Sequence, residues 1–214
     1  MNNDNQIQSI DTLKDIKRIM EQSTRFLSLS GWSGIWAGSI ALIGGTIAHV
    51  QISDYYKDYN FRGEFSTSQF NSLKIKLLLL AFTIVIVALI GAYFFTNRKI
   101  KKEGLSIWNQ ASKKLMLNLA IPMIAGGILI LGFLQHNDWC YVAPSCLIFY
   151  GLALINGSKF TLNDIRYLGI LELSLGCICI YFPGLGLYFW IAGFGILHIV
   201  YGILMWKKYD SNSN

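Results

Sequence analysis

The run LLLLAFTIVIVALIGAYFF at residues 77–95 contains no charged residue and no proline. A helix needs about 20 predominantly apolar residues to cross a hydrocarbon core about 30 Å thick. The strands of a membrane barrel would instead alternate between apolar and polar positions, and this run does not alternate. It therefore predicts a membrane-spanning helix.

Five further apolar stretches flank this run. The 214-residue chain is 53% hydrophobic and only 14% charged, with a mean hydropathy of +0.44, which is typical of a multi-pass membrane protein rather than a soluble domain. We predict an all-α transmembrane bundle of six helices in three hairpins: 31–52, 77–95, 115–135, 139–156, 167–183 and 184–206. A polar segment, 1–30, precedes this domain of residues 31–206, and a short polar tail, 207–214, follows it.

Lysine and arginine are distributed unevenly between the two predicted sides. The amino-terminal segment, the second and fourth connections and the tail are basic, whereas the third and fifth connections carry neither residue. Cytoplasmic loops are enriched in these residues, so both termini are predicted to be cytoplasmic. The net charge of +6 then reports topology and favours contact with anionic lipid headgroups. No nucleic-acid-binding motif accompanies the basic residues, so a nucleic-acid partner is not expected.

Two segments outside the spans carry recognisable patterns. The amino-terminal segment predicts an amphipathic helix with apolar residues about one turn apart: Ile7, Ile10, Leu13, Ile16 and Met20. This helix could lie on the inner membrane surface, which we favour, or dock a cytoplasmic protein partner. Residues 53–72 are polar and aromatic, and they predict an outer loop of about twenty residues.

The third predicted span contains Pro122, one helical turn after Asn118. Proline has no backbone N–H and disturbs a helix interior, so we expect a kink at this point.

Small residues follow a three-four spacing along the first span and therefore share one face of the helix. The stripe consists of Gly31, Gly34, Gly38, Ala41, Gly45 and Ala48. Small residues at this spacing allow a second helix to approach closely. The neighbour could be another helix of the same chain, which we favour, or a second copy of the protein in a homo-oligomer.

The fifth and sixth spans each place one polar residue between two glycines. The two triplets are Gly169, Glu172 and Gly176, and Gly195, His198 and Gly202. Folding these spans into an antiparallel hairpin would bring Glu172 level with Gly195 and His198 level with Gly169, with the two polar residues about 4.5 Å apart along the helices. A lone carboxylate near the bilayer centre costs about 3 kcal/mol or more. We therefore expect Glu172 to be protonated, paired with His198 or exposed to a water-filled cavity, and we take this pair as the candidate site.

No metal or cofactor site is predicted. Only three histidines are present, and His49 and His198 should lie about 14 Å apart in depth, too far to ligate one iron together. All four cysteines fall in the outer halves of the fourth and fifth spans, where free thiols are expected and a Cys146–Cys177 disulfide is the alternative. The chain lacks a phosphate loop and a serine nucleophile elbow, so the sequence assigns no catalytic residue.

Two segments, RFLSLSGWSGIWAGSIALIGG at 25–45 and YLGILELSLGCICIYFPGLGLYFWIAGFGILHIVYGILM at 167–205, resemble a group of uncharacterised bacterial six-helix membrane proteins. The resemblance covers about residues 25–208. It implies a protein of the bacterial inner membrane, and it carries no established activity.

Two functions fit these features. The first is a non-enzymatic membrane module, such as a partner-binding, sensory or accessory subunit, which accords with the small size and the amphipathic amino-terminal segment. The alternative is a small proton-linked transporter or permease that uses Glu172 with His198. The sequence contains no clear inverted repeat or matched pair of broken helices in support of this alternative.

Overall fold

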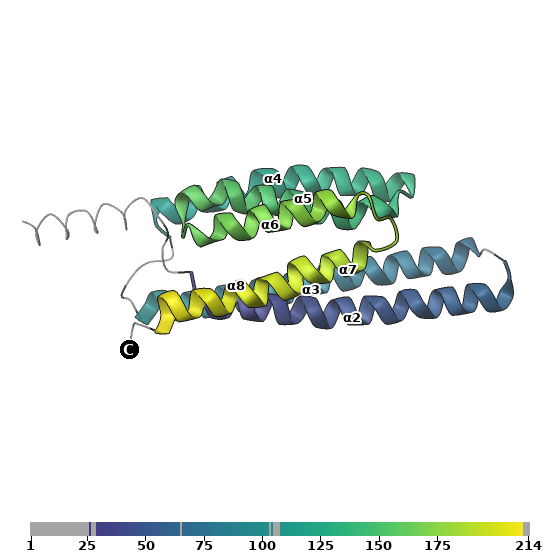
Figure 1. Cartoon of the computed structure of the whole chain (residues 1–214), viewed down its shortest axis with the longest axis horizontal. Helices are drawn as coiled ribbons and strands as arrows, with labels where there is room; N and C mark the ends of the chain where they lie inside the picture. Colours follow the sequence, from purple (N-terminus) through teal and green to yellow (C-terminus); the bar gives the residue numbers. More distant parts are fainter. Residues whose placement is uncertain (1–25, 27–28, 65, 103, 105–107, 212–214) are drawn as a thin grey trace, which may run out of the picture.

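The computed structural model describes residues 26, 29–64, 66–102, 104 and 108–211. Every regular element among them is helical, and six helical spans follow one another along the chain (Figure 1). They are α2 Gly31–Arg62, α3 Thr67–Lys102, α4 Gln110–His136, α5 Val142–Gly157, α6 Asp164–Cys179, and a final span composed of α7 Gly186–Trp190, η3 Ile191–Leu197, α8 His198–Met205 and η4 Trp206–Asp210. Short 3₁₀ turns, Trp139–Tyr141 and Ser158–Phe160, flank α5. The predicted all-α class is confirmed for the described residues, whereas the predicted amino-terminal amphipathic helix lies outside them.

Five of the six spans are long and apolar enough to cross a membrane. These are α2, α3, α4, the stretch Trp139–Phe160 around α5, and the final span Gly186–Asp210. The remaining span, α6, has 16 residues. Large apolar side chains cover the outside of α3 and α4, where Phe82 and Ile128 are each 66% exposed. Such an apolar exterior is expected of a helical bundle whose surroundings are lipid.

The first two helices are longer than the sequence analysis predicted. Residues 53–72, expected to form an outer loop, instead extend α2 to Arg62 and begin α3 at Thr67. No glycine or proline interrupts α2 after Gly45 until Gly63, which ends the helix in a left-handed conformation with φ of 71°. In Figure 1 this helical hairpin projects beyond the other spans on the right. The loop prediction is wrong because the helix continues past its apolar part.

The spans form two layers of three helices (Figure 1). In one layer α2 lies between α3 and the final span, and in the other α5 lies between α4 and α6. Because successive helices alternate in direction, the two central helices, α2 and α5, run in opposite directions. The layers contact each other mainly where α5 and α6 meet α7, η3 and α8.

Each layer contains one seam at which two backbones approach closely. In the first, α2 packs on the final span: a Cβ added to Gly38 would lie 2.7 Å from the Gly195 oxygen, and one added to Gly202 would lie 2.5 Å from the Ile35 nitrogen. Gly31 and Gly34 face the same neighbour, and Ala41 and Ala48 are buried on α2. The stripe therefore lies against a helix of the same chain.

The second seam joins α5 to α6. A Cβ added to Gly151 would lie 2.6 Å from the Leu173 nitrogen, and one added to Gly169 would lie 2.8 Å from the Gly151 oxygen. Alanine at either position would therefore force a backbone to shift. Close packing of this kind, through small residues, is a general means of helix association in membranes.

Helix α4 continues through Pro122 from Gln110 to His136. Because proline has no N–H, it leaves the carbonyl of Asn118, four residues earlier, without its helical donor. The Asn156 amide of α5 donates to this carbonyl at 3.0 Å and to the Asn118 side-chain oxygen at 3.1 Å. The polar group released by the proline thus becomes a contact between the two helices.

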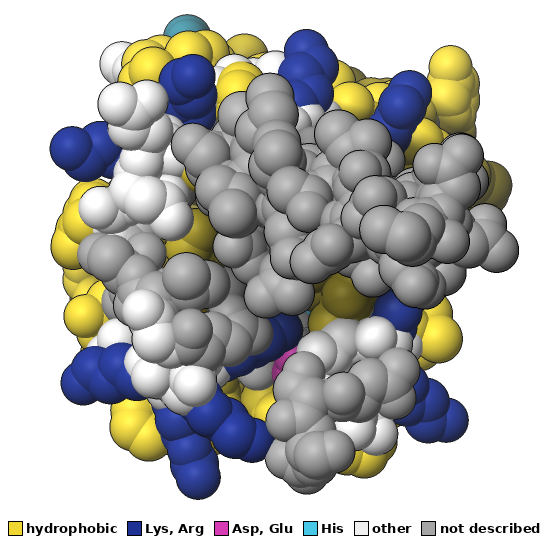
Figure 2. Space-filling model, turned by 90° about the vertical axis from the view of Figure 1, so that its left-hand side faces the viewer, with side chains coloured by type: hydrophobic (Ala, Val, Ile, Leu, Met, Phe, Trp, Pro, Cys, Tyr) yellow, Lys and Arg dark blue, Asp and Glu magenta, His cyan; other side chains and the backbone are white. Residues whose placement is uncertain are grey.

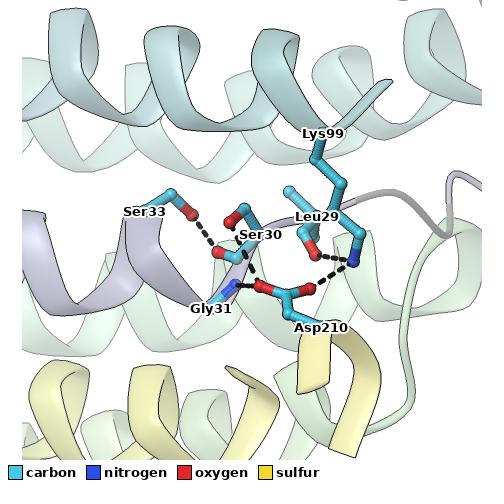
Figure 3. A network of polar contacts seen from close by, with 6 residues as sticks. All are labelled: Leu29, Ser30, Gly31, Ser33, Lys99 and Asp210. Atoms are coloured by element: carbon cyan, nitrogen blue, oxygen red, sulfur yellow. Dashed lines mark hydrogen bonds and ion pairs between the residues drawn. The ribbon is translucent and has the colours of Figure 1, made fainter. Parts of the chain in front are cut away.

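The end of the final span is fastened to the start of α2 (Figure 3). The Asp210 carboxylate accepts hydrogen bonds from the Gly31 N–H at 3.0 Å and the Ser30 hydroxyl at 3.2 Å, so it caps the amino terminus of α2. Lys99 of α3 donates to the other oxygen of Asp210 at 2.6 Å and to the Leu29 carbonyl at 3.0 Å. All three helices of this layer are therefore joined at one end.

Candidate functional site

The two polar residues singled out from the sequence lie at the boundary between the layers. Glu172 is on α6, and His198 is the first residue of α8. Glu172 is completely buried and His198 is 7% exposed. A third polar side chain, Tyr150 of α5, completes the group.

Hydrogen bonding fixes the orientation of the His198 ring. Its Nδ1 lies 3.1 Å from the Gly193 carbonyl oxygen and 3.3 Å from Oε1 of Glu172, and its Nε2 lies 2.8 Å from the Tyr150 hydroxyl. A backbone carbonyl only accepts, so Nδ1 carries a proton. When the imidazole is neutral, Tyr150 donates to Nε2; when it is protonated, Nε2–H donates to the tyrosine oxygen.

The Glu172 carboxylate is poorly satisfied. Neither of its oxygens has a hydrogen bond of good geometry among the described residues, and only the 3.3 Å approach to His198 offers an opposite charge. Burial of an ionised carboxylate without hydrogen bonds is unfavourable. Two arrangements avoid an unpaired buried charge: a neutral Glu172 acid beside a neutral His198, or a Glu172 carboxylate paired with a protonated His198. Loss of one proton from either arrangement leaves an ionised Glu172 beside a neutral His198.

A π-helix shapes the pocket for the carboxylate. The segment Ile191–Leu197 is π-helical, a wide-turn conformation that often marks functional sites. Gly193 lies within it, and a Cβ at this position would be 2.4 Å from Oε2 of Glu172. Glycine at 193 therefore provides the space that the carboxylate occupies.

The glycine partners differ from those expected. Gly195 faces Leu42 and Gly202 faces Ile35, both on α2, while Gly169 and Gly176 face α5. The expected register is wrong because α6 and α8 belong to different layers, and each turns its glycines toward the central helix of its own layer. The room for Glu172 comes from Gly193, a residue that the sequence analysis missed.

Tyr150 was also missed, since a tyrosine in an apolar span carries no distinctive signal. The centroid of its ring lies 5.0 Å from that of Phe194, and the Phe194 ring stacks on His198 with 5.8 Å between the ring centroids. Trp190 extends this group, 5.2 Å from Phe194. These aromatic rings give the polar group an apolar wall, in which electrostatic interactions are strengthened.

Other candidate chemistry is not assembled in the described part of the chain. No group of three or more His, Cys, Asp or Glu residues there is placed to hold a metal ion. The four cysteines are free thiols, so Cys146 and Cys177 are not bonded to each other.

Comparison with known proteins yields no family: no family model, curated protein or solved structure matches the chain. The resemblance noted from the sequence therefore stays a prediction.

Proposed function

We propose that the chain is a six-span protein of the bacterial inner membrane with both termini in the cytoplasm. The uneven distribution of lysine and arginine supports this orientation. The five long apolar spans and the apolar exterior of α3 and α4 support insertion into a bilayer. In this orientation the projecting end of the α2–α3 hairpin lies outside the cytoplasm.

We further propose a non-enzymatic sensory or accessory module that responds to proton binding at Glu172 with His198. The observation that carries this proposal is the fully buried Glu172 carboxylate, which has no hydrogen bond to any described residue and lies where the two layers meet. His198 and Gly193 belong to the layer of α2, whereas Glu172 and Tyr150 belong to the layer of α5. Gain or loss of a proton changes the attraction across this boundary, and with it the packing of one layer on the other.

The output of such a module would pass to a partner. The amino-terminal segment, which we expect to lie on the inner membrane surface, is also the candidate docking element for a cytoplasmic protein, and a second copy of the chain is a further candidate partner. Deletion of residues 1–24 should abolish recovery of the partner while leaving the helical bundle folded; unchanged recovery would contradict this assignment.

The proton response can be tested with Glu172→Gln, which keeps the size of the side chain and removes its ionisation. Hydrogen–deuterium exchange of the full chain in lipid nanodiscs should vary with pH in the α6 and final-span peptides of the wild type. After correction for the pH dependence of intrinsic amide exchange, the protection of these peptides in the variant should be the same from about pH 5 to about pH 8, a range in which Asp164 stays ionised. Glu64→Gln, a change at an exposed carboxylate beside the α2 terminus, is the matched control and should behave as the wild type. Persistence of the pH response in Glu172→Gln would refute the proposal.

A second candidate, a small proton-linked transporter, is favoured by a separate observation. The central helices of the two layers run in opposite directions, and the final span contains a π-helical segment beside Glu172. Transporters commonly place coupling sites between oppositely oriented helix groups, next to discontinuous helices. An acid pulse on proteoliposomes containing a pH-sensitive dye distinguishes the two candidates. Proton flux above that of protein-free vesicles, abolished by Glu172→Gln in folded protein, indicates a transporter, whereas flux that Glu172→Gln leaves unchanged contradicts this use of the carboxylate.

A further inference from the structure

A groove separates the start of α6 from the end of the final span. Its volume is about 410 Å³, within the range of roughly 300–1,000 Å³ that small ligands occupy. It is lined by Asp164, Tyr167, Tyr201, Leu204, Met205, Lys207 and Lys208. In the proposed orientation the groove lies at the cytoplasmic surface of the membrane.

The walls of this groove are apolar and open to the side. Tyr167 is 60% exposed and Leu204 is 54% exposed, and these two residues come from the two different spans. Side chains of this kind, at the edge of a membrane domain, face lipid rather than water. The groove is thus accessible from within the bilayer.

The charges at the mouth do not cancel. Lys208 donates to both oxygens of Asp164, at 3.1 Å and 2.9 Å, and Tyr209 donates to the same carboxylate at 2.7 Å. Partial burial opposes ionisation of Asp164, but these hydrogen bonds and the Lys208 charge outweigh it, and the pKa of this carboxyl lies below its usual value. Lys207 lines the same groove, is exposed and forms no ion pair within the described residues. One positive charge is therefore left over.

The surroundings reinforce this charge. Figure 2, which looks at this end of the molecule, shows lysine and arginine side chains at several places around its rim, among the residues that it colours by type. These described basic side chains favour the approach of an anion from the inner leaflet. The hydroxyl of Tyr201, which lines the groove, offers a further hydrogen-bond donor.

We propose that the groove binds one anionic phospholipid of the inner leaflet. Its phosphate lies against Lys207 and its upper acyl chain lies between Tyr167 and Leu204. A basic pocket between membrane spans on the cytoplasmic side is the setting in which anionic headgroups are bound. A soluble anion would leave the apolar walls uncovered, whereas a phospholipid satisfies both the charge and the walls. This inference rests on the proposed membrane orientation but is independent of the proton role of Glu172.

Native mass spectrometry of the full chain, released from bilayers with equal amounts of phosphatidylglycerol and phosphatidylcholine, tests the proposal. The wild type should retain one phosphatidylglycerol in preference to phosphatidylcholine. Lys207→Gln should reduce this preference roughly fivefold, the effect of one lysine near an anionic lipid. Lys159→Gln removes an exposed lysine at the same end but outside the groove and should leave the preference unchanged.

Two further measurements make the result specific. Leu204→Trp should fill the groove and reduce retention of both lipids while Lys207 is still present. An excess of soluble glycerol phosphate should not displace the lipid. Equal retention of the two lipids by the wild type, an equal effect of Lys207→Gln and Lys159→Gln, or displacement by glycerol phosphate would each overturn the proposal. Lys207 is exposed, so Lys207→Gln should fold as the wild type does. If Leu204→Trp misfolds, the comparison of Lys207→Gln with Lys159→Gln decides the outcome.

Discussion

Replacement of Gly151 by alanine is expected to push α6 away from α5 and to disturb the polar group between the layers. The new methyl group would lie 2.6 Å from the Leu173 nitrogen and 2.7 Å from the Gly169 oxygen. Both are backbone atoms, which cannot rotate aside as a side chain can. Ordinary contact begins at 3.4 Å, so the helices must separate by about 3.4 − 2.6 = 0.8 Å. Overpacking of this kind costs about 1–3 kcal/mol.

The displacement should reach Glu172, because this residue precedes Leu173 on α6. Its 3.3 Å approach to His198 is already long for an ion pair with hydrogen bonding, so a further separation would weaken it. Gly151→Ala should therefore lower the stability of the bundle and also change the pH response proposed for Glu172.

Equilibrium unfolding in mixed detergent micelles, followed by circular dichroism, measures the stability change. Gly127→Ala is the matched control, since nothing lies within 4 Å of its Cβ position, and the better helix propensity of alanine should leave stability unchanged or raised by up to about 1 kcal/mol. Gly169→Ala opens the same seam, so the double variant with Gly151→Ala should lose less than the sum of the two single losses. Unfolding of Gly151→Ala at the same point as Gly127→Ala would refute the close-packing explanation.

Two other predictions concern single contacts. Asn156→Leu should destabilise the protein by about 1–2 kcal/mol, because the Asn118 carbonyl loses its hydrogen-bond donor. Adding Pro122→Ala restores a helical N–H for this carbonyl, so the double variant should recover most of the lost stability. Unfolding experiments that show no recovery would contradict the explanation. Asp164→Asn should lower the thermal midpoint most at neutral pH: the pKa of Asp164 in the folded protein is below its ordinary value of 3.8, so its stabilising contribution is complete above that value and is lost as the pH falls through the folded pKa. A difference between wild type and Asp164→Asn that persists unchanged in acid would show that the ionised carboxylate is not responsible.

The α2–α3 extension illustrates a limit of sequence reasoning about membrane helices. Hydropathy marks the part of a helix that can lie in the bilayer, so a hydropathy pattern predicts that the polar residues 53–72 form a loop. The sequence does indicate that α2 continues beyond its apolar part, since it contains no glycine or proline between Gly45 and Gly63. The end of an apolar run shows where the helix can leave the bilayer. The end of the helix itself depends on the backbone conformation, here the left-handed Gly63.

The candidate site shows the same division between local and global information. The sequence alone determined the number of spans in the described part of the chain, the small-residue stripe of α2 and the helix positions of Glu172 and His198, because each follows from the apolar length or the 3.6-residue period of one helix. Only the tertiary structure decided that α6 and α8 belong to different layers, that their glycines face α5 and α2, and that Gly193 and Tyr150 complete the site. A helix period fixes which residues share a face but not which neighbour that face meets, since the neighbour depends on how all six helices pack together.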